Sequence, residues 1–224
     1  MPRFKPKSQV LIHAELDPEH KSGVNALMSR AQSKRGLETV WVRLPETKGT
    51  DTEERRKKLK EALAVLDGDS RVLLDGHCLW EMLNLGAETA EKWAEELIRA
   101  ELPAVMVIDV LGCSAGHEGP ASVHHAKTST TSFARELHKA LKNSKAKDAP
   151  VIARTYDTAV CEIEGGHYGT KLTFSGDDDD FGLNITFKHQ TGSKVQYTWN
   201  GAIQVRTILE YDNAQNIPVA AVLY

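Results

Sequence analysis

Short apolar runs alternate with helical patterns over the first two thirds of the chain, and this alternation constrains the fold more than any other feature. The runs that predict buried strands lie at 9–13, 39–44, 71–76, 104–111 and 150–154. The spacings that predict helices lie at 17–35, 51–66, 87–100 and 128–143. Because parallel strands need crossover connections, and helices are the usual crossovers, this order predicts an α/β sandwich with a mostly parallel central sheet.

From about Thr155 the pattern changes to short alternating runs separated by glycine-rich and acidic turns, which is typical of antiparallel hairpins. The length of 224 residues indicates one domain rather than two. We therefore expect a single domain over 1–224, made of an α/β core at 8–154, an antiparallel β-rich segment at 155–200 and an extension at 201–224. The apolar end of the extension suits either an added strand or a tail that occupies a cleft.

Composition is that of an ordinary globular domain, with 41% hydrophobic and 26% charged residues. The formal net charge of −3 gives no reason to expect a nucleic-acid partner or a membrane surface. No apolar run approaches the roughly 20 residues of a membrane helix, and residues 1–9 do not resemble a signal peptide, so we expect a soluble chain. Three cysteines are too few for a disulfide framework, which favours a reducing compartment or a functional thiol.

Two reactive side chains directly follow two of the predicted strands. His77 follows the run at 71–76, and Cys113 follows Gly112 at the end of the run at 104–111. The carboxyl ends of parallel strands meet at one edge of a sheet, so the imidazole and the thiol come within reach if the strands are neighbours. An imidazole that takes the thiol proton creates a thiolate nucleophile, and glycines beside the cysteine let backbone N–H groups reach a developing oxyanion.

Each of these residues also has an ordinary structural interpretation. A cysteine at a strand end is often a small buried hydrophobe, and a single histidine often packs in a core. His117, His124 and His125 lie near the cysteine in sequence, but their spacing matches no closed zinc pattern, so no metal site is expected. Spacing alone leaves the catalytic and the structural interpretations of His77 and Cys113 equally open.

The residues around this pair resemble a known family. The pairing of VLLDGHC at 72–78 with VIDVLGCSAG at 107–116 is similar to the caspase-like clan of cysteine peptidases. The closest resemblance is to the inositol-hexakisphosphate-activated protease domains of MARTX toxins and large clostridial glucosylating toxins. It extends over roughly residues 8–200 and includes VLIHAELDPEHKSGVNAL, ETVWVRL, LGAETAEKWAEEL, SFARELHKAL and KVQYTW. The resemblance implies a caspase-like three-layer sandwich in which the segment at 155–200 forms a β-flap.

The resemblance implies a cysteine endopeptidase in which His77 is the general base and Cys113 forms a thioester with the substrate. Asp17 matches the acid that orients the histidine in some members, and it also suits the N-cap of a helix before Pro18. The backbone N–H groups of Cys78 and Cys113 match the oxyanion hole. Family members usually carry glycine at the position of Cys78, whose side chain narrows the site or strains the backbone. A buried inert thiol and a partner for Cys113 are two open roles for Cys78.

The resemblance also implies activation by inositol hexakisphosphate, a polyanion that requires several Lys and Arg donors. The residues near the family's basic positions are Arg30, Lys34, Arg71, Arg154, Lys171 and Lys194. The acidic run at 177–180 works against a basic cluster, so a different activator, or none, stays an alternative. The setting implied by the resemblance is a secreted bacterial effector or toxin domain that acts in host cytosol.

The resemblance also implies a protein substrate that is cleaved after leucine, in cis or in trans. Residues 1–8 contain no leucine, so we expect either a chain that begins after the usual self-cleavage site or cleavage of another protein. Two other classes remain open. One is a catalytically silent module that senses a phosphorylated ligand, and the presence of Cys78 after His77 favours it. The other is a thiol-dependent acyltransferase.

Overall fold

The fold is known from a computed structural model of the chain. It describes residues 5–14, 38–44, 52–79, 83–86, 88–112, 114–119, 128–155, 161–163, 167–169, 194–212 and 217–223.

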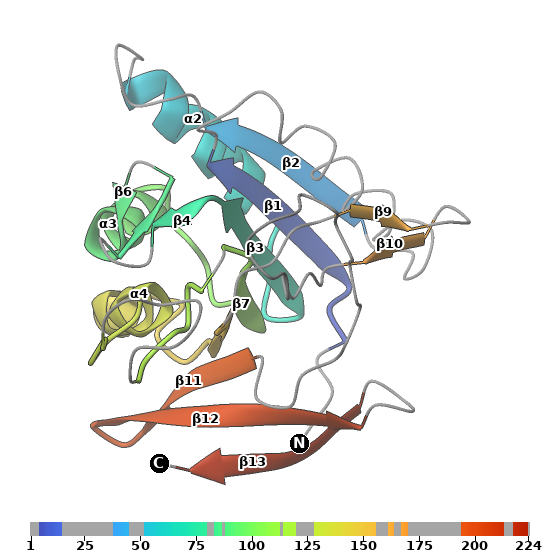
Figure 1. Cartoon of the computed structure of the whole chain (residues 1–224). Coiled ribbons are helices and arrows are strands. Elements are labelled where there is room, and N and C mark those ends of the chain that lie inside the picture. The colour runs from blue at the N-terminus through green and yellow to red at the C-terminus, as the bar shows by residue number, and fades with distance from the viewer. Residues whose placement is uncertain are drawn as a thin grey trace.

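An eight-stranded sheet forms the centre of the molecule, in the order β13-β12-β11-β8-β7-β3-β1-β2 (Figure 1). Its parallel part consists of β2 (Glu38–Leu44), β1 (Ser8–Ala14), β3 (Ser70–Gly76), β7 (Val107–Val110) and β8 (Val151–Arg154). Its antiparallel part consists of β11 (Lys194–Asn200), β12 (Ile203–Asp212) and β13 (Ile217–Leu223). The expected fold class, an α/β fold with a mostly parallel central sheet and antiparallel C-terminal strands, is therefore confirmed.

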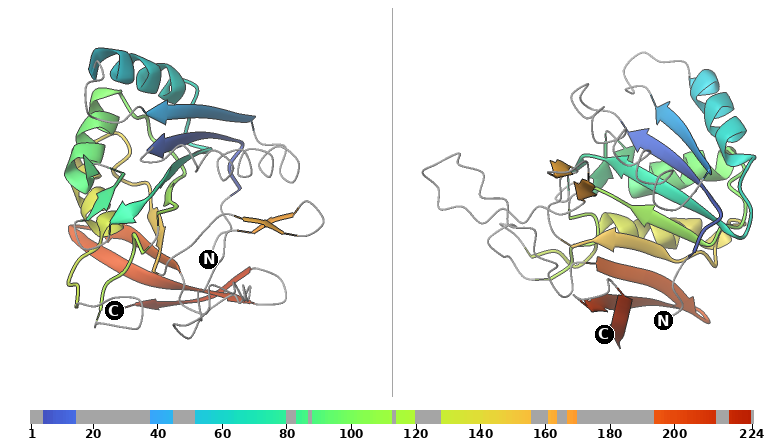
Figure 2. Two further views of the ribbon diagram at one scale, coloured as in Figure 1. Left: turned by 45° about the horizontal axis from the view of Figure 1, so that its top comes forward. Right: turned by 90° about the vertical axis from the view of Figure 1, so that its right-hand side faces the viewer.

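Three helices lie together on one face of this sheet (Figure 2). They are α2 (Thr52–Leu63), α3 (Ala90–Arg99) and α4 (Phe133–Ala140), and a 3₁₀ turn, η3 (Leu141–Asn143), follows α4. The expected helix over 17–35, which the second helical layer of a three-layer sandwich requires, lies outside the described residues.

Two of the helices begin later than their sequence patterns predict, because hydroxyl side chains cap them. The pattern over 87–100 predicts a helix from its first residue, but α3 begins after the N-cap Thr89, whose hydroxyl accepts from the Lys92 N–H. Similarly, α4 begins after Ser132, whose hydroxyl accepts from the Arg135 N–H at 3.2 Å. These caps satisfy backbone donors that the first helical turn leaves without intrahelical partners.

The hydrophobic core lies between the sheet and the helices. Trp93 and Leu137 project from α3 and α4 and pack in one cluster with Ile12, Leu74 and Ile108 of the sheet, all of them at most 1% exposed. Fully burying a side chain of this size contributes roughly 1.5–3 kcal/mol each, which ties the helices to the parallel strands.

The opposite face of the sheet carries a row of polar side chains, because residues alternate between the two faces along each strand. Gln9, His13, Asp109 and Arg154 are buried and belong to this face. The Arg71 guanidinium donates to the Gln9 side-chain oxygen, with Nε at 3.0 Å. The sheet therefore has one apolar face and one face with substantial polar content.

Two small sheets complete the described structure. One consists of β4 (Cys78–Leu79), β5 (Asn84–Leu85) and β6 (Glu88–Thr89), and the other of β9 (Cys161–Ile163) and β10 (His167–Gly169). The strand β11 falls within the segment at 155–200 in sequence, and it pairs with β8 in the main sheet. Among the described residues, no helix has the length and apolar content needed to cross a membrane.

Candidate active site

The two strands that precede His77 and Cys113 are hydrogen-bonded parallel neighbours in the main sheet. Leu74 of β3 lies opposite Val110 of β7, and the Leu111 N–H continues the pairing by donating to the Leu74 carbonyl at 2.8 Å. Since both strands run in the same direction, the chain leaves both at the same edge of the sheet. The proximity of His77 and Cys113 depended on the condition that these two strands are neighbours, and this condition is met.

Beyond this edge, Gly112 packs directly against Cys78. A β-carbon at position 112 would lie 2.7 Å from the Cys78 Cβ, 2.7 Å from the Leu85 Cδ1 and 3.3 Å from the Gly76 carbonyl oxygen. Distances under 3.0 Å leave no room for a side chain at position 112. The residue before Cys113 therefore touches the residue after His77.

His77 has an exposed side chain, and its carbonyl accepts a hydrogen bond from the Gly86 N–H at 2.8 Å. Cys78 begins β4 and is 4% exposed, so its thiol belongs to the core. Two of the expected catalytic residues, Cys113 and Asp17, lie outside the described residues. The expected roles of the catalytic residues and of the Cys78 and Cys113 backbone in an oxyanion hole stay predictions.

The residues after Cys113 form a tightly packed loop, 114–119, which we call the post-cysteine loop. Ser114 is 1% exposed and has a positive φ of 53°, a conformation that costs energy for a residue with a side chain. The Gly116 N–H donates to the Arg154 carbonyl at 2.7 Å, and a β-carbon on Gly116 would lie 2.5 Å from the Val195 Cγ2. The loop is therefore packed closely against β8 and β11.

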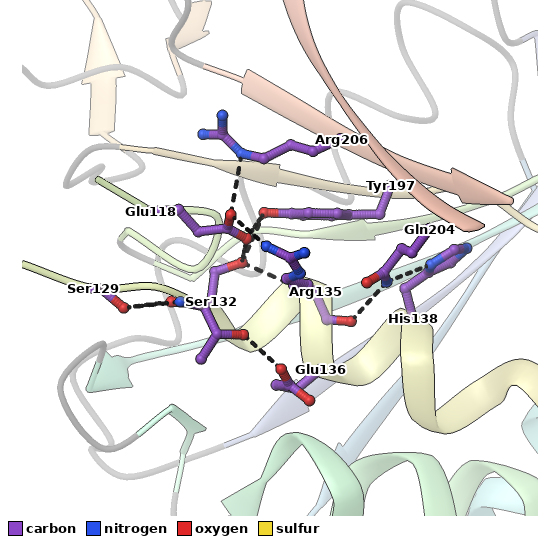
Figure 3. A network of polar contacts seen from close by, with 10 residues as sticks. Glu118, Ser129, Ser132, Arg135, Glu136, His138, Tyr197, Gln204 and Arg206 are labelled. Carbon is purple, nitrogen blue, oxygen red and sulfur yellow. Dashed lines mark hydrogen bonds and ion pairs between the residues drawn. The ribbon is translucent and has the colours of Figure 1, made fainter. Parts of the chain in front are cut away.

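A polar network joins the far end of this loop to the C-terminal strands (Figure 3). The Glu118 carboxylate accepts from the Tyr197 hydroxyl at 2.6 Å, from the Ser132 hydroxyl at 3.1 Å and from Arg135 Nη1 at 3.0 Å. Arg206 Nε lies 3.7 Å from the same carboxylate. Sequence reasoning did not single out this network, and Ser132 alone had a local signal, the Ser and Thr run before α4.

Burial changes the protonation of two groups in and beside the network. Tyr197 is fully buried, and burial together with the Glu118 charge raises the pKa of its hydroxyl well above the ordinary value. Burial lowers the pKa of His138 from 6.5 to about 4. His138 accepts from Gln204 Nε2 at 2.8 Å and stacks on Trp199, with ring centroids 4.9 Å apart. Both side chains hold one protonation state near neutral pH.

A buried imidazole–carboxylate pair lies on the polar face of the sheet, close to the end of β3. His13 Nδ1 is 2.7 Å from Asp75 Oδ2, and the two residues lie opposite each other in the β1–β3 register. His13 is 2% exposed, and its Nε2 has no hydrogen-bond partner among the described residues. The apolar run at 9–13 predicts a buried strand correctly, but nothing in it indicates that His13 meets Asp75.

The structure describes three of the six expected phosphate-binding residues, namely Arg71, Arg154 and Lys194. Lys194 lies directly opposite Arg154 in the β8–β11 register, so the structure brings these two together on the polar face. Arg71 lies at the start of β3, opposite Val107, whereas Arg154 is at the end of β8, so Arg71 is not beside them. The other expected members, Arg30, Lys34 and Lys171, lie outside the described residues. Within the described part of the chain, no group of three or more His, Cys, Asp or Glu side chains could hold a metal ion.

Comparisons with known proteins give similarity at the level of structures. No family model matches the sequence, and no curated protein matches it. A caspase-1 of Spodoptera frugiperda is 10% identical with a TM-score of 0.36, and the match covers 70% of this chain and 63% of that chain. A structure described as SPT with PLP is 13% identical with a TM-score of 0.30, and the match covers 66% of this chain and 29% of that chain. The chain thus spans less than two thirds of either protein.

Proposed function

We propose that the chain is a cysteine endopeptidase of the caspase-like class, with His77 as general base and Cys113 as nucleophile. The contact between Gly112 and Cys78 carries this proposal. Covalent geometry puts the α-carbons of His77 and Cys113 about 3.8 Å from those of Cys78 and Gly112. From such positions the His77 imidazole and the Cys113 thiol can reach each other, as proton transfer between them requires.

In the proposed reaction, His77 takes the proton of the Cys113 thiol, and the thiolate attacks the carbonyl carbon of the scissile bond. The His77 imidazolium then gives its proton to the departing amine, which leaves an acyl thioester. Water adds to the thioester and releases the carboxylic acid and the free thiol. We assign Asp17 to orienting the imidazole, and leucine to the position before the scissile bond.

The backbone pairing between β4 and β5 supports the proposed contribution of the Cys78 N–H to the oxyanion hole. Hydrogen-bonded and non-hydrogen-bonded pairs alternate along antiparallel strands. Since the Gly86 N–H donates to the His77 carbonyl, the next pair, Cys78 with Leu85, is of the non-hydrogen-bonded type. The Cys78 N–H therefore points away from β5, as a donor to a substrate oxyanion must.

We further propose that inositol hexakisphosphate activates the enzyme. The juxtaposition of Arg154 and Lys194 in the β8–β11 register supports this, because two adjacent cationic side chains are the kind of donors that a polyphosphate requires. Arg71, Arg30, Lys34 and Lys171 are the other proposed contributors. The proposed setting is a secreted bacterial effector or toxin domain in host cytosol, where it cleaves a protein in cis or in trans.

The test is covalent labelling with a peptide that carries leucine before an electrophilic ketone, read by intact mass and by mapping of the labelled residue. We expect labelling of Cys113 in the wild type and in the matched control Cys161→Ala. Cys113→Ala should show none, and His77→Ala should react at least tenfold more slowly, because general-base catalysis contributes roughly 10²–10⁴-fold. Each protein is measured with and without inositol hexakisphosphate.

Outcomes separate the peptidase from its alternatives. A folded wild type that stays unlabelled in both conditions would contradict the peptidase and favour the second candidate, a catalytically silent module that binds a phosphorylated ligand. The Cys78 side chain after His77 and the Arg154–Lys194 pair favour that candidate. Labelling followed by transfer of the acyl group to an added amine, with no hydrolysed product by mass, would instead indicate an acyltransferase.

A further inference from the structure

The post-cysteine loop is fastened to the rest of the molecule at several backbone positions. The Ala134 N–H donates to the Ala115 carbonyl at 2.9 Å, which ties the loop to the start of α4. Gly119 pairs with Ser129 through two backbone hydrogen bonds of 2.9 Å. Between these ties, Glu118 makes the loop's ionic contacts with the C-terminal strands.

Side chains from three separate elements contact the Glu118 carboxylate, three by hydrogen bonds and Arg206 as an ion pair. Ser132 and Arg135 belong to the start of α4, Tyr197 belongs to β11, and Arg206 belongs to β12 (Figure 3). The Glu118 side chain is 12% exposed, so its carboxylate is largely shielded from water. One carboxylate thus connects the loop to a helix and to two strands that are distant in sequence.

The two oxygens of the Glu118 carboxylate serve different partners. The Tyr197 and Ser132 hydroxyls lie 2.8 Å apart and both reach the same Glu118 oxygen. The other oxygen faces the Arg135 and Arg206 guanidiniums. Replacing the carboxylate by a neutral group removes the counter-charge of two partly buried arginines, and buried donors without acceptors are costly.

We propose that Glu118 is a positioning residue for the nucleophile, an inference that rests on the proposed function. Ser114, immediately after Cys113, has a positive φ, and such a conformation persists only where the surrounding structure enforces it. By fixing the other end of the loop, Glu118 stabilises this backbone conformation of Ser114. It holds the loop in the conformation from which Cys113 reaches the substrate, and it transmits the position of β11 and β12 to the nucleophile.

The experiment compares Glu118→Gln with the wild type, using the whole chain and a fluorogenic peptide with leucine before the scissile bond. Glutamine keeps the shape of the side chain and removes its charge. We expect kcat to fall about 10–100-fold while KM changes less than twofold, since small displacements of reacting groups cost up to about 100-fold in rate. The alkylation rate of Cys113 by iodoacetamide should stay within threefold, because that reagent needs no substrate alignment.

Glu136→Gln is the matched control. Glu136 also lies at the start of α4, accepts from the Thr131 hydroxyl at 2.6 Å and pairs with Lys139, and neither of these contacts involves the post-cysteine loop. We expect kcat within twofold of the wild type for this variant. Tyr197→Phe removes one donor to Glu118 and serves as a second test if Glu118→Gln does not fold; its kcat should fall as well.

The outcomes distinguish this inference from the function on which it rests. A wild type without turnover and without labelling of Cys113 overturns the proposed peptidase, and the role of Glu118 with it. A wild type that turns over, with kcat unchanged in folded Glu118→Gln or in Tyr197→Phe, overturns the positioning role alone. A rise in KM at constant kcat also overturns it, because that result indicates lost substrate binding rather than a displaced nucleophile.

Discussion

A β-carbon on Gly112 would lie 2.7 Å from the β-carbon of Cys78, so the two residues that flank the proposed nucleophile and base are in direct contact. This contact predicts that Gly112→Ala destabilises the protein by about 1–3 kcal/mol, the usual cost of overpacking a core. Gly68→Ala is the control, because nothing lies within 4 Å of a β-carbon there. Urea unfolding of both variants checks the prediction, and equal midpoints would contradict it.

A second prediction concerns the contact between Gly116 and Val195. Gly116→Ala should destabilise the protein, because its new methyl group would lie 2.5 Å from the Val195 Cγ2. Val195→Ala should also destabilise it by leaving a cavity. The double variant should be more stable than the sum of the two effects predicts, by about 0.5–3 kcal/mol, since each change relieves the other. A double-mutant cycle measured by urea unfolding that gives simple additivity would refute the contact.

The His13–Asp75 pair gives a third prediction. Asp75→Ala removes the partner of a buried imidazole, and we expect a loss of about 1–3 kcal/mol in the free energy of unfolding. Asp75→Asn keeps a side-chain oxygen that can accept a hydrogen bond, so it should recover most of the loss. Asp69→Ala is the control, because its carboxylate pairs with Lys7 at the exposed surface and should contribute little. Chemical denaturation at pH 7 compares the three.

The sequence predicted the strands well, because buried parallel strands are continuous apolar runs, and every such run from 9–13 to 150–154 contains a strand. The helix starts were less accurate, since the capping hydroxyls of Thr89 and Ser132 decide them and the apolar period does not. The spacing of strands along the sequence does not determine which strands are neighbours, so the adjacency of β3 and β7 became known only from the sheet order. The interval from 155 to 200 was expected to be hairpins, and one strand within it joins the main sheet.

The Glu118 network could not be predicted, and the reason is physical. Its members come from a loop, a helix and two strands, and no periodic pattern relates residues whose proximity depends on the pairing of β11 with β8. Tyr197 lies in a run whose alternation predicts a strand, but its partner depends on tertiary packing. Local patterns therefore identify elements, whereas polar contacts between distant elements need the assembled sheet.

The fourth prediction concerns pH. The pKa of His138 is about 4 in the folded protein and 6.5 when unperturbed, so the unfolded chain binds a proton that the folded protein does not. Stability contributed by neutral His138 is complete above pH 6.5 and is lost as pH falls from 6.5 to 4, by about 2 kcal/mol.

His138→Gln should show less of this loss, because glutamine does not titrate and its oxygen can still accept from Gln204. The measurement is the free energy of unfolding at pH 7 and pH 4.5 for both proteins. An identical decrease in the two would show that His138 does not contribute to the pH dependence.

The long reach of the Glu118 network has a consequence for synthesis of the protein. Tyr197 follows its partner Glu118 by 79 positions, so the ribosome adds it roughly 4–16 s later, at 5–20 residues per second. Once β8 has been added, the parallel strands and Cys113 already exist, while the contacts of Glu118 with Tyr197 and Arg206 do not. The proposed positioning role of Glu118 therefore predicts a nascent chain without peptidase activity until β11 and β12 are made.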